Sequence, residues 1–278
     1  MVAALLTGGG QAQASAPTDP VKALKKQFAP GRGVRVSETN RTVVSGIKGA
    51  IPTRTTGVIG FGKSAAVDYD LISRTTLTDE QKADLLGSLD YELTPLHAIK
   101  VGRYTFVKGF HWGTMPEGKH WIRFGGSASW GDDGQRGDQH VDVLDPAILK
   151  TVISKAAIVK SGEYRGTLTA EELYKEKYGH EVRKISFRLF VNRDQLPVRL
   201  ITEYTRKAEV PDKDGKLVKE TEHNVIDTRY SDWGAKVTIS APPADEVIDF
   251  DDVKWPSNEE TPTGTVTDRL QDAAPTKD

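Results

Sequence analysis

The strongest constraint on the fold is an alternation of apolar and polar residues that recurs in many short stretches. Val34 and Val36 begin one such stretch, and Ile185, Phe187 and Leu189 alternate with polar neighbours in another. A period of two places every second side chain on the same face of a strand, so each stretch predicts a strand with one buried face. The chain is therefore expected to build a large antiparallel sheet whose apolar face needs a cover.

Helices are predicted at four places. The clearest begins at Pro146 behind the cap Asp145 and carries one apolar stripe that includes Ile148 and Val152. Capping residues predict three more helices, over residues 18–28, 78–89 and 169–178. The order of helix, strand meander, central helices and strands is typical of an α+β domain with a large antiparallel sheet.

Residues 224–247 predict a closing pair of strands joined by a turn at 231–234. Gly234 can take a positive φ in this turn. Alternation resumes over residues 237–240, and Pro242 ends the pairing because proline has no N–H to donate to a ladder. This stretch organises the sheet and contains no catalytic constellation.

Residues 57–64, GVIGFGKS, match the phosphate-binding pattern G-x-x-x-x-G-K-[ST] in full. In a true phosphate loop, backbone N–H groups surround the phosphates, and the lysine, here Lys63, reaches the outer ones. Such a loop lies between a buried strand and a helix, whereas residues 65–73 alternate with period two. The stretch favours a β-hairpin in which Gly60 and Gly62 relieve crowding, and nucleotide binding through Lys63 is the alternative.

The composition excludes several classes of function. The net charge is −1, so the chain has no basic field for nucleic acid, and it has no cysteine. No apolar run approaches the ~18 residues of a membrane span. The six histidines form no metal pair, and Asp132, Asp133 and Asp138 miss the spacing of a calcium loop. Because a G-x-S-x-G motif is also absent, we predict a protein with no cofactor, no metal and no enzymatic activity.

The two ends of the chain differ from its centre. Residues 1–16 look like the end of a secretory signal, with a short apolar run and a small-residue cleavage site, and a disordered leader is the alternative. Residues 252–278 are rich in Asp, Glu, Pro and Thr and predict a disordered tail. Residues 17–251 are expected to form one domain.

Six segments carry a family resemblance through their order and spacing. They are DPVKALKKQF (19–28), GVIGFGKS (57–64), VDVLDPAILKTVI (141–153), GEYRGTLTAEELYK (162–175), FRLFVNRDQLPVRLIT (187–202) and DTRYSDWGAKVTISAPPADEV (227–247). Together they resemble the secreted proteins and lipoproteins of actinobacteria that share the LolA/LppX-like half-barrel. None of the six segments is a catalytic signature.

The resemblance implies a strongly curved antiparallel sheet, a half-barrel, with helices packed on its concave side and an apolar cavity between them. It implies a secreted, non-enzymatic carrier or binder of a lipid or other hydrophobic ligand. Many relatives carry a lipidated cysteine, and because this chain has none, an extracytoplasmic protein without a lipid anchor fits better. A related branch senses envelope stress, so a sensor whose charged arm, Lys207–Glu222, contacts an envelope protein is the alternative.

Inward-facing positions supply the candidate lining of such a cavity. They are Tyr104, Phe106, Phe187, Leu189, Leu200 and Tyr204 on predicted strands, and Ile148 and Val152 on the predicted helix. Alternation does not say which face of the sheet is concave, so the strand set could be inverted. An ordinary packed core is the alternative for each of these residues.

Overall fold

The computed structural model describes residues 19–86, 94–109, 115–125, 137–160, 162–174, 184–211 and 217–254. The strands are β1 (Arg32–Val44), β2 (Ile51–Phe61), β3 (Ala66–Thr75), β4 (Leu96–Val101), β5 (Tyr104–Lys108), β6 (Trp121–Phe124), β7 (Ala157–Lys160), β8 (Glu163–Leu168), β9 (Ile185–Val191), β10 (Pro197–Pro211), β11 (Leu217–Lys236) and β12 (Val247–Asp249). The helices are α1 (Pro20–Gln27), α2 (Asp79–Leu86), α3 (Pro146–Ser154) and α4 (Ala170–Tyr174), with 3-10 turns η1 (Ala244–Glu246) and η2 (Phe250–Asp252).

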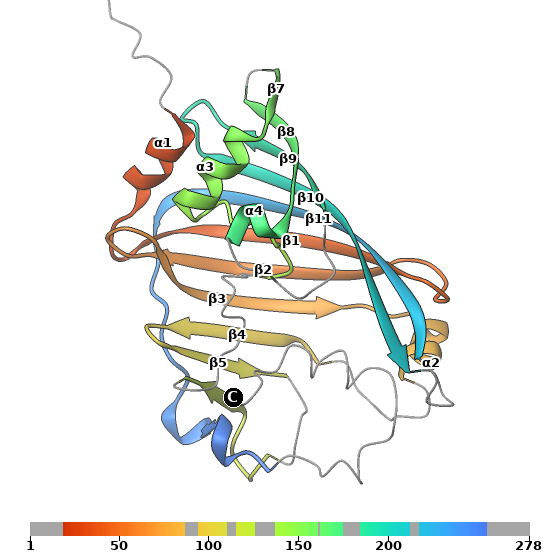
Figure 1. Cartoon of the computed structure of the whole chain (residues 1–278). Helices are drawn as coiled ribbons and strands as arrows, with labels where there is room; N and C mark the ends of the chain where they lie inside the picture. Colours follow the sequence, from red (N-terminus) through yellow and green to blue (C-terminus); the bar gives the residue numbers. More distant parts are fainter. Residues whose placement is uncertain are drawn as a thin grey trace, which may run out of the picture.

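The strands form one twelve-stranded sheet in the order β12-β6-β5-β4-β3-β2-β1-β11-β10-β9-β8-β7. Neighbouring strands are antiparallel except for β12, which runs parallel to β6. The sheet is strongly curved, and α1, α3 and α4 lie in its hollow (Figure 1). The fold is therefore the α+β half-barrel, with helices on the concave side, that the sequence predicts.

Strand β1 sets the two faces of the sheet. Its residues are buried and exposed in turn from Val34 to Glu38, because even-numbered side chains point into the hollow. Val36 lies opposite Gly57 of β2 and Tyr230 of β11, so the register carries the same inward row across neighbouring strands. A polar residue at an even position of β1 is therefore buried with the core.

The predicted helix starts are confirmed where the structure describes them. In α1, the Asp19 carboxylate accepts a hydrogen bond from the backbone N–H of Val21 at 3.0 Å, with Pro20 as the first helical residue. Helices α2 and α4 are described up to Leu86 and Tyr174, and the remaining parts of the predicted ranges, 87–89 and 175–178, lie outside the described residues. Residues 1–16 lie outside them as well.

The predicted turn at 231–234 is wrong. Strand β11 continues through it to Lys236, with positive φ at Asp232 (52°) and Gly234 (75°). The register with β1 shifts there between Gly33 and Arg35, so the two residues form a bulge inside one strand and do not turn the chain back. Residues 237–240, predicted as the second strand, are not in a strand.

The chain after β11 crosses the convex face of the sheet and reaches β6, with which β12 pairs. Ile239 packs there with the apolar cluster of Ile99, Phe106 and Trp121, and the N–H of His120 donates to the carbonyl of Glu246 at 2.8 Å. Val253 is also buried, beside β5 and β6. The packed part of the chain thus passes the predicted boundary at residue 251, and residues 255–278 lie outside the described part.

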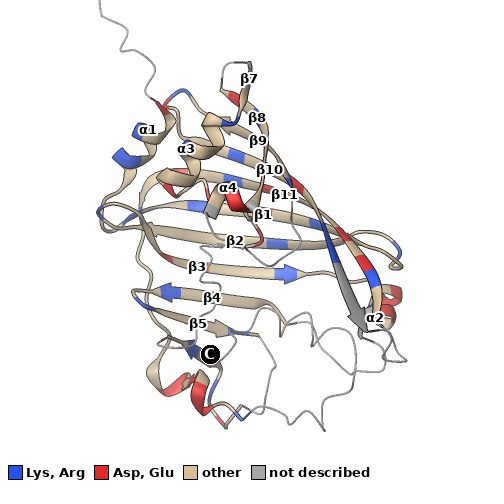
Figure 2. Cartoon of the chain, in the orientation of Figure 1, with Lys and Arg blue, Asp and Glu red and all other residues tan. Residues whose placement is uncertain are grey.

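Charges of both signs are spread along the strands and helix ends (Figure 2). Several are arranged in pairs across strands, such as Arg199 with Asp227 at 2.6 Å and Arg206 with Glu222 at 3.0 Å. Arg199 and Asp227 pair on the outer face of the sheet, whereas Arg206 and Glu222 belong to the inward rows of β10 and β11, beyond Tyr204. No helix within the described residues is long and apolar enough to cross a membrane.

Candidate functional site

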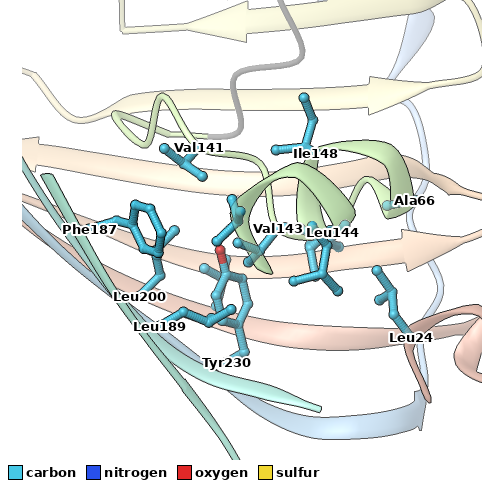
Figure 3. Packing of buried hydrophobic residues seen from close by; sticks show 14 of the residues in the cluster. Leu24, Ala66, Val141, Val143, Leu144, Ile148, Phe187, Leu189, Leu200 and Tyr230 are labelled. Atoms are coloured by element: carbon cyan, nitrogen blue, oxygen red, sulfur yellow. The ribbon is translucent and has the colours of Figure 1, made fainter. Parts of the chain in front are cut away.

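The hollow of the half-barrel is lined by two bands of different chemistry, which together form the candidate site. The first band is apolar. Its side chains come from α1, α3 and α4 on one side and from the inward rows of the sheet on the other, in a single cluster. Leu144, Leu149 and Val152 face the sheet with at most 1% of their surface exposed, and Figure 3 shows the cluster around Leu144 and Ile148.

Helix α3 forms because its start is capped and its interior is apolar. The Asp145 carboxylate accepts from the N–H groups of Ala147 at 2.6 Å and Ile148 at 3.2 Å, and Pro146 takes the position that needs no N–H partner. The Thr151 and Ser154 hydroxyls donate to carbonyls of the helix itself. Apolar packing therefore holds α3 on the sheet, whereas the side-chain hydrogen bonds of Thr151 and Ser154 are formed within the helix.

The second band is polar and begins one row further along the strands. Its centre is Glu38, which is 2% exposed. One carboxylate oxygen of Glu38 accepts from the backbone N–H of Asp138 at 2.7 Å, and the other accepts from the Thr228 hydroxyl at 2.6 Å. Gln139 donates to Thr228 at 3.0 Å and accepts from the Thr202 hydroxyl at 2.7 Å. Residues 137–139, just before the apolar segment 141–144, are thus fixed to the sheet by buried hydrogen bonds.

The close approach of the chain to Glu38 depends on Gly137. Its φ of 90° lies in the left-handed region, and a Cβ there would lie 2.7 Å from the Glu38 carboxylate. The backbone can therefore pass directly over the carboxylate and present the N–H of Asp138 to it.

Asn40 extends the polar band on β1. Its amide nitrogen donates to the Asp138 carboxylate at 3.0 Å, while its Oδ1 atom is buried and has no hydrogen-bond partner within the described structure. Burial raises the pKa of Glu38 to about 7, with a further contribution from the nearby Asp138 carboxylate. Burial also raises the pKa of Asp138. The band is thus a cluster of acceptors that favours protons or other positive charge.

Six of the eight predicted lining residues lie in the hollow. Phe187, Leu189, Leu200 and Tyr204 point inward from β9 and β10, and Ile148 and Val152 point toward the sheet from α3. Tyr204 lies at the polar end, edge-on to His140 at 4.7 Å between ring centroids, and burial raises the pKa of its hydroxyl.

The other two predicted residues, Tyr104 and Phe106, lie on the convex face. In β5 the side chains of Thr105 and Val107 point inward, so those of Tyr104 and Phe106 point to the convex face. Phe106 is buried there against Ile99 and Trp121, beneath the segment that follows β11. The structure does not bring these two residues together with the other six.

The apolar band is closely packed. A cavity of about 10 Å³ lies between segment 139–144 and the sheet, lined by Val36, Ile59, Gln139, Val141, Asp142, Leu144 and Tyr230. This volume is at the lower limit of about 10–15 Å³ that one ordered water molecule needs. The described side chains of this band pack against one another in one buried cluster, so a ligand of acyl-chain size beneath α3 requires some of them to move.

A larger cavity, of about 220 Å³, lies at the opposite end of the sheet. Its wall includes the Tyr104 ring. The guanidinium groups of Arg103 and Arg123 lie over this ring, at 4.7 Å and 5.0 Å from its centroid. Arg123 is bound through two hydrogen bonds to Asp249, so its charge is already neutralised. This cavity is separate from the hollow under the helices.

The phosphate-loop match lies in the β2–β3 hairpin, as predicted. Gly57 is inside β2, and Lys63 and Ser64 are exposed at the turn, followed by strand β3 instead of a helix. No three His, Asp or Glu side chains of the described residues are gathered as a metal site would require, and Asp132 and Asp133 lie outside those residues.

The residues of the polar band were not predicted from the sequence as a site. One signal could have found Glu38 and Asn40, because they continue the even-numbered row of Val34 and Val36 and must share its buried face. Asp138 and Gln139 lie in a loop, and no local sequence pattern predicts that this loop packs against β1.

Comparisons with known proteins leave the family open. No protein-family model matches the chain, and no curated protein matches it. Solved structures that resemble it include a LolA superfamily protein from Nitrosomonas europaea, with 13% identity and a TM-score of 0.29 over 81% of this chain and 93% of that one. A DUF1329 family protein from Desulfovibrio piger has 13% identity and a TM-score of 0.31, covering 77% and 94%. A domain named for outer membrane lipoprotein sorting, from Vibrio parahaemolyticus, has 9% identity and a TM-score of 0.30, covering 77% and 89%. Likenesses at this level carry no argument about function.

Proposed function

We propose that the protein is an extracytoplasmic, non-enzymatic binder or carrier of an apolar ligand, such as a lipid, held between α3 and the concave face of the sheet. The observation that carries this proposal is the way α3 is attached. Its contacts with the sheet are apolar, and its side-chain hydrogen bonds stay within the helix. An apolar chain can replace such contacts without leaving buried polar groups unpaired.

The polar band anchors the segment that precedes α3. Residues 137–139 are bound to β1, β10 and β11 through Glu38, Thr202 and Thr228, so the segment before α3 keeps its place. Helix α3 follows this anchor after a few residues. We propose that α3 swings away from the sheet about the anchored segment and that the ligand takes the space beneath Ile148 and Val152.

Two buried phenylalanines provide a matched test of this assignment. Phe187 is 3% exposed in the hollow, and Phe106 is 7% exposed on the convex face. Alanine at either position removes a buried ring and lowers stability by a few kcal/mol, about 3–5 by analogy with other cores. Because only Phe187 lines the proposed site, Phe187→Ala is expected to weaken binding of a fluorescent acyl-chain probe roughly tenfold, whereas Phe106→Ala leaves the Kd within about twofold.

The probe titration uses delipidated protein, at a temperature at which both variants are folded. Equal effects of the two substitutions on the Kd would mean that affinity follows stability and that the hollow is not the binding site. No saturable binding by the unmodified protein, combined with no acyl compound in a solvent extract of natively secreted protein, would remove the carrier proposal altogether.

A further inference from the structure

The two bands of the hollow meet along a sharp boundary. On β1 the inward row changes from Val34 and Val36 to Glu38 and Asn40, and on β10 it changes from Leu200 to Thr202. A ligand that lies along the apolar band therefore has one end at the polar band. The chemistry of that band determines which end group the ligand carries.

Within the part of the chain that the structure describes, the polar band offers acceptors and no counter-charge. Neither the Glu38 nor the Asp138 carboxyl forms an ion pair with a Lys, Arg or His side chain among the described residues. Burying two carboxylates without a cation is costly, because charge is poorly solvated in a protein interior. A positively charged ligand group would supply the missing partner.

Asn40 gives an independent indication of the same chemistry. It is 8% exposed, its nitrogen binds Asp138, and its buried Oδ1 has no donor within the described structure. An unpaired buried acceptor costs free energy, so a donor at this position would stabilise the folded protein. The free Oδ1 lies on the amide group that already touches the Asp138 carboxylate, which places the unfilled acceptor beside the unpaired charge.

We infer that the polar band binds a primary ammonium group at one end of the apolar ligand. An ammonium group has three N–H donors, which match the Asp138 carboxylate, the Asn40 Oδ1 and the remaining acceptor capacity of Glu38. A divalent metal fits less well, because calcium takes six to eight oxygen ligands and magnesium needs a near-octahedral set. Asp138 is of intermediate exposure, whereas Glu38 and Asn40 are buried, so Asp138 is the member of the cluster nearest the solvent. This inference rests on the proposed binding of an apolar ligand.

The test compares three ligands with the same twelve-carbon chain and different ends: dodecylamine, dodecanol and dodecanoic acid. Each competes with a fluorescent acyl-chain probe for the delipidated full-length protein, below its critical micelle concentration. The amine is expected to bind at least tenfold more tightly than the alcohol, and the acid more weakly than the alcohol. Asp138→Asn is expected to reduce the preference for the amine over the alcohol to within about threefold.

Binding of the alcohol by Asp138→Asn shows that this variant is folded. Asp70→Asn, on the convex face, is the matched control and is expected to keep the full preference for the amine. Equal affinities for all three ligands, or a preference for the acid, would overturn the inference and leave the proposed function standing. Stabilisation by calcium chloride alone, without a preference for the amine, would also overturn it, in favour of a metal ion. If none of the three ligands displaces the probe or binds, the proposed function itself fails.

Discussion

Raising the pH from about 4.5 to about 7 is expected to lower the free energy of unfolding by roughly 3 kcal/mol through Glu38 alone, since one pKa unit corresponds to about 1.4 kcal/mol. The folded protein holds the Glu38 proton up to a pKa of about 7, whereas the unfolded chain releases it near 4.5. Below 4.5 both states are protonated and the group has no effect. Between the two values only the unfolded state loses its proton, so unfolding becomes more favourable. Above 7 the full cost of burying the carboxylate remains.

Glu38→Gln removes this titration. Urea unfolding of the two proteins between pH 4.5 and pH 8 is expected to show a difference in free energy that changes by roughly 3 kcal/mol across the range. Glutamine keeps an acceptor for the N–H of Asp138, so the variant retains part of the hydrogen-bond network. Glu171→Gln, at an exposed position of α4, controls for the loss of one carboxyl. A difference that stays constant with pH would show that Glu38 titrates normally and that its surroundings are open to water.

Gly57→Ala is expected to destabilise the protein by about 3 kcal/mol or more. A Cβ at Gly57 would lie 1.9 Å from the carbonyl oxygen of Asp70 and 3.0 Å from the Cα of Leu71, both in the backbone of β3. Backbone atoms in a paired strand cannot rotate aside as a side chain can, so β2 and β3 must separate locally. The midpoint of urea unfolding measures the loss.

The second glycine of the phosphate-loop pattern is the matched control. A Cβ at Gly62 would meet the Val67 side chain at 3.0 Å, and Val67 is 41% exposed and free to adjust. Gly62→Ala is therefore expected to change stability by less than about 0.5 kcal/mol. The opposite ranking of the two variants would contradict the assignment of Gly57 to strand packing. Excess ATP and magnesium are expected to leave the melting temperature of the unmodified protein unchanged.

Local patterns predicted the elements of this fold well because each element carries its own signals. Asp145 and Pro146 mark the start of α3 through capping chemistry alone, and alternation around Phe187 defines β9. Short strands without such a pattern, β7 and β12, were not predicted, since four or three residues are too few to show a period.

The candidate site was less predictable because it depends on which strand faces meet. Alternation gives the two faces of each strand but not which one is covered, so Phe187 and Phe106 look equivalent in sequence although they lie on opposite sides of the sheet. The bulge at Asp232 and Gly234 has the composition of a turn, and only pairing with β1 reveals that the strand continues. The meeting of Asp138 with Glu38 spans 100 residues of sequence and is a product of the whole topology.

The movement of α3 away from the sheet is the central claim, and a distance measurement tests it most directly. The chain has no cysteine, so spin labels attach only to cysteines that are introduced. The first pair of labels is placed by Lys150→Cys, on the exposed side of α3, and Ser37→Cys, on the convex face of β1. A second pair, Ser37→Cys with Ser186→Cys of β9, reports on the sheet itself. When the acyl-chain probe saturates the protein, pulsed electron–electron double resonance is expected to show a longer or broader distribution of distances between the two labels of the first pair. The distance between the labels of the second pair is expected to stay the same. Saturation of the probe with both distances unchanged would contradict the account.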